Sequence, residues 1–164
     1  MQVVLISFDQ LPQLEVAEKI DVGFCALGTT LRKAGSKEHQ QEIDRDYVIA
    51  FGEFCKKAGV EKLGIVSSIG ANPESSNFYL RTKGEMELGV GKLGIPLTVF
   101  IRPSFLIGPR KETRSGDKLI QTLSFLISPL LFGKAKKYKG IHASKVAEKL
   151  IHATLTESAG IYYI

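Results

Sequence analysis

The chain has 164 residues, of which 44% are hydrophobic and 24% charged, with a formal net charge of +5. This is enough for one domain with a buried core, and the composition is that of an ordinary globular protein. The charge is too small for a dedicated nucleic-acid binder, no apolar run reaches membrane-span length, and the N-terminus lacks the features of a signal peptide. Two cysteines and scattered histidines indicate neither a disulfide framework nor a metal site, so we expect a cytoplasmic protein without nucleic-acid or membrane partners.

Apolar runs alternate with helical patterns along the first two thirds of the chain. Short apolar runs predict buried strands, and apolar positions three or four residues apart predict helices. Strands are expected at residues 1–8, 22–27, 63–68 and 97–101, and helices at 14–20, 44–58 and 79–93. Residues 32–42 are polar and read as a loop or a helix start, and Asp44 is expected to cap the helix that follows. This alternation predicts an α/β protein with a doubly wound parallel sheet.

The pattern changes after Arg110. A helix is expected at residues 118–132, a basic run at 134–139, a second helix at 146–155 and a short strand at 161–164. We expect a single domain, in which residues 111–164 form a region for substrate or oligomer contacts. The apolar helix at 118–132 suits the core, a dimer contact or a substrate lid.

Ser67 and Ser68 end the third expected strand, and Tyr79 and Lys83 follow on the next helix. Side chains four residues apart share a helix face, so the phenol and the amine are expected to lie together. An ammonium group stabilises a phenolate and lowers the pKa of the phenol, which suits a tyrosine for proton transfer. The pair alone is common on helices where the tyrosine packs and the lysine reaches solvent. Its position after a strand that ends in serine favours the functional interpretation.

Several short motifs come in an order and spacing that point to one family. They are Asp21-Val22-Gly23-Phe24-Cys25-Ala26-Leu27-Gly28-Thr29-Thr30, Asp44-Arg45-Asp46-Tyr47-Val48, Ser67-Ser68-Ile69-Gly70-Ala71, Ser75-Ser76-Asn77-Phe78-Tyr79, Lys83-Gly84-Glu85 and Arg102-Pro103. The run from Asp21 to Arg114 resembles the atypical short-chain dehydrogenases/reductases, and most closely their Tat-interacting oxidoreductase-like branch. The resemblance implies a Rossmann-like fold and NAD or NADP as the cofactor.

The resemblance also implies roles for individual residues. Tyr79 would be the acid/base, Lys83 would tune it and hold the nicotinamide ribose, and Ser68 would orient the substrate carbonyl. Successive strand residues point to opposite faces, so only one serine of the pair can serve, and Ser68 is the choice by analogy. Further residues assigned to cofactor binding are Leu27, Gly28, Thr29, Ser67, Arg102 and Pro103. For Arg102 a structural ion pair is an equal alternative.

One part of the family pattern is missing. The glycine-rich turn G-x-x-G-x-x-G, which lets the backbone approach the pyrophosphate, does not occur in the sequence. Aligned by order, the chain lacks the first strand-helix-strand unit. We expect a fragment of a longer chain, with a natural short form as the alternative, and an apolar strand edge left open in either case.

The functional prediction is an NAD(P)-dependent oxidoreductase-like protein that transfers hydride to or from a small carbonyl or alcohol. The alternative is a non-catalytic regulator or interaction module on the same fold, with a protein partner. The sequence leaves open the substrate, the choice between NAD and NADP, and whether the protein forms a homodimer.

Overall fold

The computed structural model describes residues 5–16, 18–104, 106–107 and 140–164. The chain forms two compact units, Met1–Arg102 with Leu150–Ile164, and Pro103–Lys149. The first unit contains the sheet and the residues Ser68, Tyr79 and Lys83.

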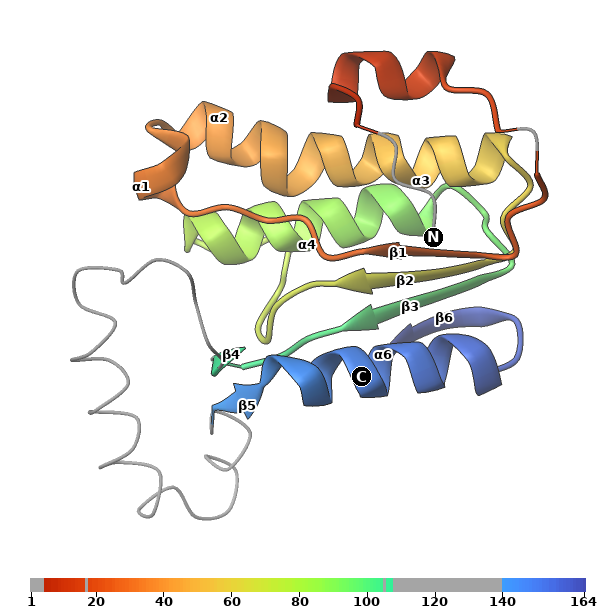
Figure 1. Cartoon of the computed structure of the whole chain (residues 1–164). Helices are drawn as coiled ribbons and strands as arrows, with labels where there is room; N and C mark the ends of the chain where they lie inside the picture. The colour runs from red at the N-terminus through yellow and green to blue at the C-terminus, as the bar shows by residue number, and fades with distance from the viewer. Residues whose placement is uncertain (1–4, 17, 105, 108–139) are drawn as a thin grey trace. The chain divides into compact units, whose positions relative to one another are not determined.

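The sheet of the first unit has four parallel strands in the order β1-β2-β3-β6 (Figure 1). They are β1 (Val22–Cys25), β2 (Lys62–Val66), β3 (Leu97–Ile101) and β6 (Gly160–Tyr163). The central strands are buried on both faces, which explains their continuous apolar sequences. The predicted α/β class, the parallel sheet and these four strands are therefore confirmed, with bounds shifted by up to two residues.

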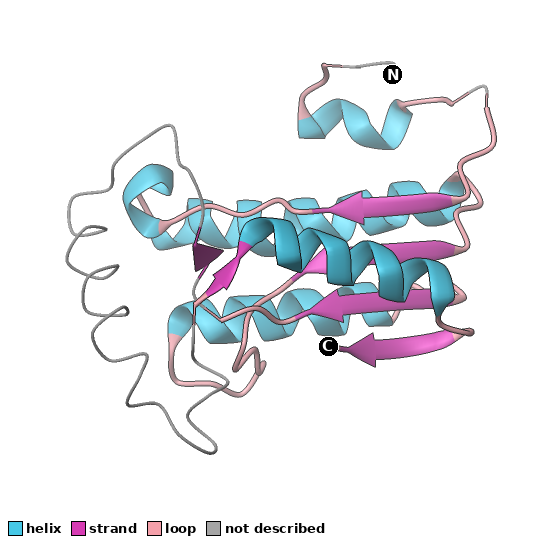
Figure 2. Ribbon diagram, turned by 60° about the horizontal axis from the view of Figure 1, so that its bottom comes forward, coloured by secondary structure: helices cyan, strands magenta, loops and turns pink. Residues whose placement is uncertain are grey.

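Two glycines identify the two faces of the sheet. A Cβ at Gly23 would meet Cys55 and Phe51, both on α3 (Tyr47–Lys57), whereas a Cβ at Gly64 would meet Phe24 and Thr154. Thr154 belongs to the last part of α6 (Ala143–Thr156). Helices α3 and α4 (Phe78–Gly91) lie together on one face, and the residues of α6 that belong to the first unit lie on the other (Figures 1 and 2).

Helices α3 and α4 close the main core against β2 and β3. The buried side chains of this cluster come from all four elements, so the core is one continuous layer between the helices and the sheet. Its fully buried members include Val48, Leu63, Ile65, Met86, Val90 and Phe100. The two expected helices at 44–58 and 79–93 are confirmed.

The helix that ends at Lys57 begins earlier than the sequence predicts. After α1 (Leu31–Ala34), the helical segments α2 (Lys37–Gln41), η2 (Glu42–Asp46) and α3 follow without a break, and η2 is a π-helical turn. The cap is Ser36, whose side chain accepts a hydrogen bond of 3.1 Å from the backbone N–H of His39. The expectation that Asp44 caps the helix is wrong, because Asp44 lies inside it and is buried.

The N-terminal segment differs from the prediction. A strand is expected at residues 1–8, but the described residues of this range form no strand of the sheet. They lead into η1 (Phe8–Gln13), which is a 3₁₀ helix. The ring of Phe8 stacks on Tyr47 with centroids 4.4 Å apart, and Leu11 is buried in the core cluster. These apolar side chains pack against α3, so they are covered although the segment pairs with no strand. The described residues of 14–20 are not helical either.

The second unit contains two short strands, β4 (Leu106–Ile107) and β5 (Ile141–His142), which pair in parallel. Neither was predicted, because two residues are too few to show a strand pattern. Helix α6 confirms the helix expected at 146–155 and starts three residues earlier. The expected helix at 118–132 and the basic run at 134–139 lie outside the described residues.

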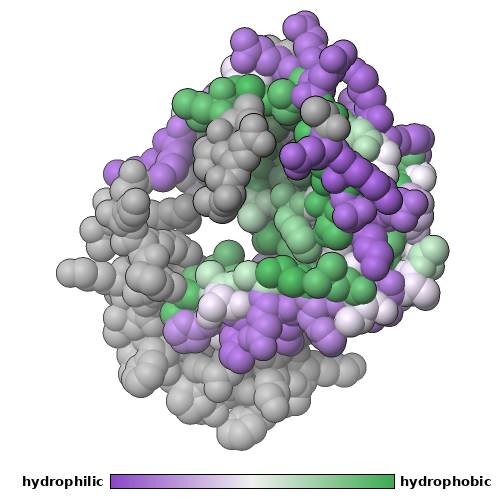
Figure 3. Space-filling model, turned by 45° about the vertical axis from the view of Figure 1, so that its right-hand side comes forward, coloured by the Kyte–Doolittle hydropathy of each residue, from purple (hydrophilic) through white to green (hydrophobic). Residues whose placement is uncertain are grey.

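Strand β1 forms an edge of the sheet, and no other described strand pairs with its free side. Phe24 in this strand is 42% exposed, and Ile151 and Leu155 of α6 are also exposed. Figure 3 shows hydrophobic side chains gathered on this side of the molecule. Within the described part of the chain, no helix has the length and apolar character needed to cross a membrane.

Candidate functional site

Helix α4 carries Tyr79 and Lys83, and Asn77 fixes its N-terminus. The side-chain Oδ1 of Asn77 accepts a hydrogen bond of 3.1 Å from the backbone N–H of Leu80, which is the geometry of a helix cap. Asn77 is therefore the cap of α4.

The loop after β2 rests directly on α4 at Gly84. A Cβ at this position would lie 2.7 Å from the Cα of Asn72 and closer still to the nitrogen of Pro73. The backbone N–H of Asn72 also donates a hydrogen bond of 3.1 Å to the carbonyl of Leu80. Because Ser68 lies near the start of this loop, the close approach of the loop to α4 brings the Ser68 hydroxyl to the helix that carries Tyr79.

Tyr79 and Ser68 lie together. Burial raises the pKa of the Tyr79 phenol above its ordinary value, the hydrogen bond with Ser68 acts in the opposite direction, and the carboxylate of Asp44 raises the pKa further. The net shift is upward, whereas the sequence predicts a pKa lowered by the ammonium group, and the phenol keeps its proton at neutral pH.

Lys83 is buried, with 3% of its surface exposed. Its Nζ donates a hydrogen bond of 3.3 Å to the carbonyl of Val66, at the end of β2. Burial lowers the pKa of Lys83, whereas the charges of Asp44, Cys25 and Glu87 raise it, Asp44 most strongly. An amine held at the carboxyl end of a central parallel strand lies where ligands bind in doubly wound sheets.

Ser67 and Ser68 have different surroundings. Ser67 is buried, and among the described residues its Oγ has no hydrogen-bond partner. The Oγ of Ser68 is half-buried and lies 3.4 Å from the carbonyl oxygen of Ile69. Buried hydroxyls are nearly always hydrogen-bonded, so the Oγ of Ser67 is a hydrogen-bonding group that the described residues leave unsatisfied.

The loop after β1 carries the predicted residues Leu27, Gly28 and Thr29. The backbone N–H of Thr29 donates a hydrogen bond of 2.6 Å to Oδ1 of Asp44, and a Cβ at Gly28 would lie 3.4 Å from the same oxygen. Leu27 packs against the core. This loop is thus tied to η2 beside Lys83.

Arg102 forms a structural ion pair, which was one of its two predicted roles. Its Nε and one terminal nitrogen bind the two carboxylate oxygens of Glu87 at 2.9 and 2.6 Å, and its guanidinium lies 4.3 Å from the ring centroid of Tyr163. The guanidinium therefore holds α4, β3 and β6 together and is engaged within the protein. Pro103 is buried and begins the second unit.

Sequence reasoning did not place two buried carboxylates, Asp44 and Glu87, near the site. Asp44 was interpreted as a cap, and Glu87 was not singled out. Glu87 stands four residues after Lys83, and this spacing is the signal by which a second charged group on the same helix face could have been found. Among the described residues no group of three histidine, cysteine or acidic side chains is placed to hold a metal ion.

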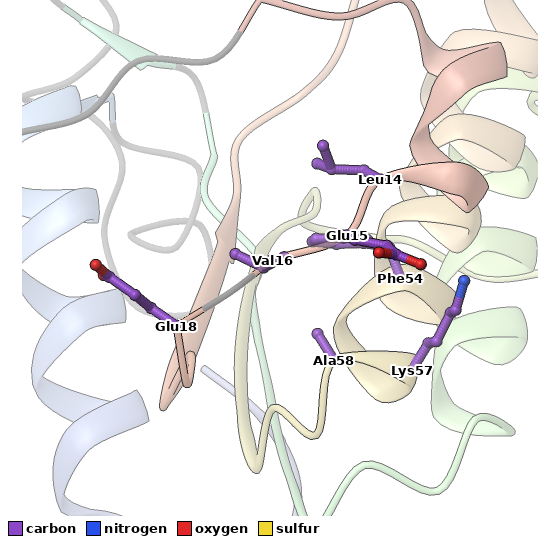
Figure 4. A pocket seen from close by; sticks show the side chains of 7 residues that line it. All are labelled: Leu14, Glu15, Val16, Glu18, Phe54, Lys57 and Ala58. Atoms are coloured by element: carbon purple, nitrogen blue, oxygen red, sulfur yellow. The ribbon is translucent and has the colours of Figure 1, made fainter.

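A shallow cavity of about 270 Å³ lies elsewhere in the first unit (Figure 4). Its lining comes from the segment between η1 and β1 and from the C-terminal end of α3, namely Leu14, Glu15, Val16, Glu18, Phe54, Lys57 and Ala58. It shares no residue with the set of predicted site residues. The amine of Lys57 is also bound to the carbonyl of Pro12 at 3.0 Å, so this cavity is part of the packing of the N-terminal segment.

Sequence comparison finds relatives of this chain in animals and fungi. Protein HTATIP2 of Rattus norvegicus is 40% identical over 116 residues, which cover 70% of this chain and 48% of that protein. The mitochondrial protein FMP52 of Candida albicans is 41% identical over 104 residues, 63% of this chain and 45% of that protein. The chain is a homologue of HTATIP2 and the FMP52 proteins. No protein-family model matches it, and it spans about half the length of the curated relatives named here.

Solved structures show the same fold at low sequence identity. A UDP-glucose 4-epimerase of Thermotoga maritima with UDP-glucose has a TM-score of 0.68 and 12% identity, over 96% of this chain and 59% of that chain. RMD of Pseudomonas aeruginosa complexed with NADPH has a TM-score of 0.65 and 16% identity, over 96% and 64% of the two chains. The predicted Rossmann-like fold and the predicted resemblance are confirmed.

The predicted cytoplasmic location needs correction. The FMP52 relatives of this HTATIP2/FMP52 homologue, in Candida albicans, Saccharomyces cerevisiae and other fungi, are mitochondrial proteins. This finding points away from a plain cytoplasmic location. The absence of signal-peptide features at the N-terminus was too weak a basis for the prediction.

Proposed function

We propose that this chain carries the proton-transfer site of an NAD(P)-dependent oxidoreductase that acts on a small carbonyl or alcohol. The observation that supports this best is the convergence of three groups at the carboxyl end of β2. The Tyr79 phenol lies near enough to the Ser68 hydroxyl for that group to act on its pKa, and the buried amine of Lys83 lies one helical turn further along α4.

The residues present fit the nicotinamide half of the cofactor. The amine of Lys83 uses one hydrogen bond within the protein, which leaves it donors for ribose hydroxyls. The buried Oγ of Ser67 is unpartnered, and Gly28 presents no side chain where its loop passes the site. The chain has no glycine-rich turn for the pyrophosphate, and Arg102 is occupied by Glu87. The parts of the chain that fit the nicotinamide half of the cofactor are therefore Tyr79, Lys83, Ser67 and the loop after β1.

When bound, NAD(P)H would supply the hydride. The chain's own residues would handle the proton and the developing charge. Tyr79 holds a proton at neutral pH because burial raises the pKa of its phenol, so it would donate that proton to the carbonyl oxygen as it becomes an alcohol. Ser68 would donate a hydrogen bond to the same oxygen and orient it. The buried charge of Lys83 would stabilise the phenolate that remains.

This arrangement favours reduction of a carbonyl at neutral pH. Oxidation of an alcohol needs the phenolate as a base, and the raised pKa of Tyr79 makes the phenolate scarce until the pH is high. Turnover in the oxidative direction is therefore expected to increase with pH well above neutrality.

The test is cofactor oxidation by the purified protein with a panel of aldehydes and ketones, measured beside the binding of NADH and NADPH. Turnover with at least one carbonyl supports the proposal. Cofactor binding without turnover on any carbonyl favours the alternative, a non-catalytic cofactor-binding regulator on the same fold. The absence of both binding and turnover contradicts the proposal.

A further inference from the structure

The first turn of α4 places an aromatic ring beside two cationic side chains, directly before Tyr79. The Nζ of Lys37 lies 5.7 Å from the ring centroid of Phe78, and the Cζ of Arg81 lies 5.9 Å from the same centroid. Both distances are those of cation–π contacts. Phe78 is the first residue of α4, and Lys37 is the first residue of α2. The ring therefore joins the beginnings of two helices.

Lys37, Phe78 and Arg81 form a cationic rim at the same end of the sheet as the proposed proton-transfer site. Strands β1, β2 and β3 point toward the end of the molecule where α2 and α4 begin (Figure 1). Tyr79, which follows Phe78 in the chain, is 38% exposed, so a ligand from solvent can reach this turn of the helix. Ligands of doubly wound sheets bind at the carboxyl ends of the strands.

The positive charge of the cationic rim is only partly balanced. Within the part of the chain that the structure describes, Lys37 contacts the Phe78 ring and forms no ion pair. The Nε of Arg81 lies 4.0 Å from Oε1 of Glu85. The other oxygen of Glu85 accepts a hydrogen bond of 2.8 Å from Arg45. One carboxylate is thus shared between two guanidinium groups, and the ammonium group of Lys37 is left without a counter-charge.

The exposed acidic residues of α2 and η2 do not supply that counter-charge. Glu42 is bound to His39 at 2.9 Å, and Asp46 is bound to Arg45 at 2.7 Å. Glu38 is exposed in the first turn of α2, and among the described residues it forms no ion pair. The cationic rim therefore keeps an excess of positive charge at a place that an anion can approach from solvent.

We infer that the substrate is a carbonyl compound with an anionic group, a carboxylate or a phosphate, which Lys37 and Arg81 bind while the carbonyl lies at Tyr79. This inference rests on the proposed function and names its class of substrate. Lys37 would supply a point charge, and Arg81 would supply the N–H groups that the carbonyl of Ser75 does not use. The Phe78 ring would pack against the apolar part of the substrate. Lys37 and Arg81 are specificity residues and take no part in proton transfer.

The test uses linear aldehydes of increasing chain length with a terminal carboxylate, each compared with its methyl ester. The ester keeps the shape and removes the charge. We expect a higher kcat/KM for the carboxylate than for its ester, and Lys37→Gln should reduce this preference about fivefold, the size of an exposed ion pair. Lys92→Gln makes the same change of charge at the exposed C-cap of α4 and should keep the preference. Equal turnover of carboxylates and esters at every chain length would overturn the inference.

A second pair of variants tests the guanidinium group. Arg81→Lys keeps the positive charge and should retain most of the preference for the carboxylate, whereas Arg81→Gln should lose it to the same extent as Lys37→Gln. Equal preferences in Arg81→Lys and Arg81→Gln would contradict a role for the charge at this position.

Binding is measured separately from turnover, because it does not require a reaction. Ligand-observed NMR compares the hydroxy acids that such a reduction would give with their methyl esters. The hydroxy acids should bind more tightly than the esters, less tightly at high salt, and about fivefold less tightly to Lys37→Gln. The affinities for NADH and NADPH should stay unchanged in that variant. A loss of cofactor affinity with an unchanged preference for the acid would assign the cationic rim to a cofactor phosphate and overturn the inference.

These readouts separate the inference from the proposed function. If the hydroxy acids bind through the cationic rim but no aldehyde is turned over, only the proposed function fails. If the esters are turned over as fast as the carboxylates and bind equally well, only the inference fails.

Discussion

The contact at Gly84 makes the arrangement of the site sensitive to a single methyl group. Gly84→Ala places a Cβ 2.7 Å from the Cα of Asn72 and closer still to Pro73. Ordinary carbon contacts are about 3.5–4.0 Å, so the loop must retreat by about 1 Å. The obstacle is backbone, which cannot rotate away as the end of a flexible side chain can.

Two effects of opposite sign set the expected stability. Overpacking of this kind costs about 1–3 kcal/mol, and alanine in place of glycine within a helix returns up to about 1 kcal/mol. A net loss of about 1–2 kcal/mol is expected. Under the proposed function the effect on turnover is larger, because the displaced loop carries Ser68, and a shift of about 1 Å at a catalytic group costs on the order of 100-fold in rate.

The assay is urea denaturation of Gly84→Ala beside Gly91→Ala. The turnover of both variants is then measured under conditions in which the parent protein is active. Gly91 is on the same helix, and a Cβ there would meet only the end of the Ile161 side chain, at 3.4 Å. The control should be as stable as the parent or slightly more stable. If Gly84→Ala matches Gly91→Ala in both stability and turnover, the account of the loop contact is wrong.

Two further predictions concern buried groups. Arg102→Met leaves the carboxylate of Glu87, 4% exposed, without its guanidinium partner and should lower the free energy of unfolding by about 3–5 kcal/mol. The double variant with Glu87→Leu should recover most of that loss. An equal loss in the single and the double variant would refute the prediction. Burial raises the pKa of the Cys55 thiol to about 12 from 9.0, so the unfolded state loses this proton first and stability should fall as the pH rises from about 9 towards 12. Cys55→Ala should show a shallower decline in urea denaturation across that range, and an identical decline would contradict the assignment.

Local patterns in the sequence were enough for most of the sheet. β2 and β3 are buried on both faces, so their apolar runs stand out, and the spacing of Tyr79 and Lys83 follows from helix geometry alone. The N-terminal segment could not be predicted in this way. Its apolar residues resemble a strand, but Phe8 and Leu11 are buried against α3 by a 3₁₀ helix, which depends on tertiary packing.

The polar details of the site were the hardest to predict. Asp44 resembles a helix cap because it precedes an apolar helical pattern, and only the π-helical turn inside the continuous helix shows that it faces inward. The partner of Arg102 is Glu87, fifteen residues away on another element, so no local pattern indicates the pair. The neighbour of Gly84 is a loop whose path the sequence does not specify.

The central claim, that Tyr79 moves the proton in an NAD(P)-dependent reaction, is tested most directly by Tyr79→Phe. The variant keeps the ring and removes the phenol, and Tyr47→Phe on the neighbouring helix is the matched control. General acid catalysis contributes about 10²–10⁴-fold, so the account predicts a turnover loss of at least about 100-fold, with cofactor affinity unchanged and the control fully active. Turnover of Tyr79→Phe equal to that of the parent would contradict the account.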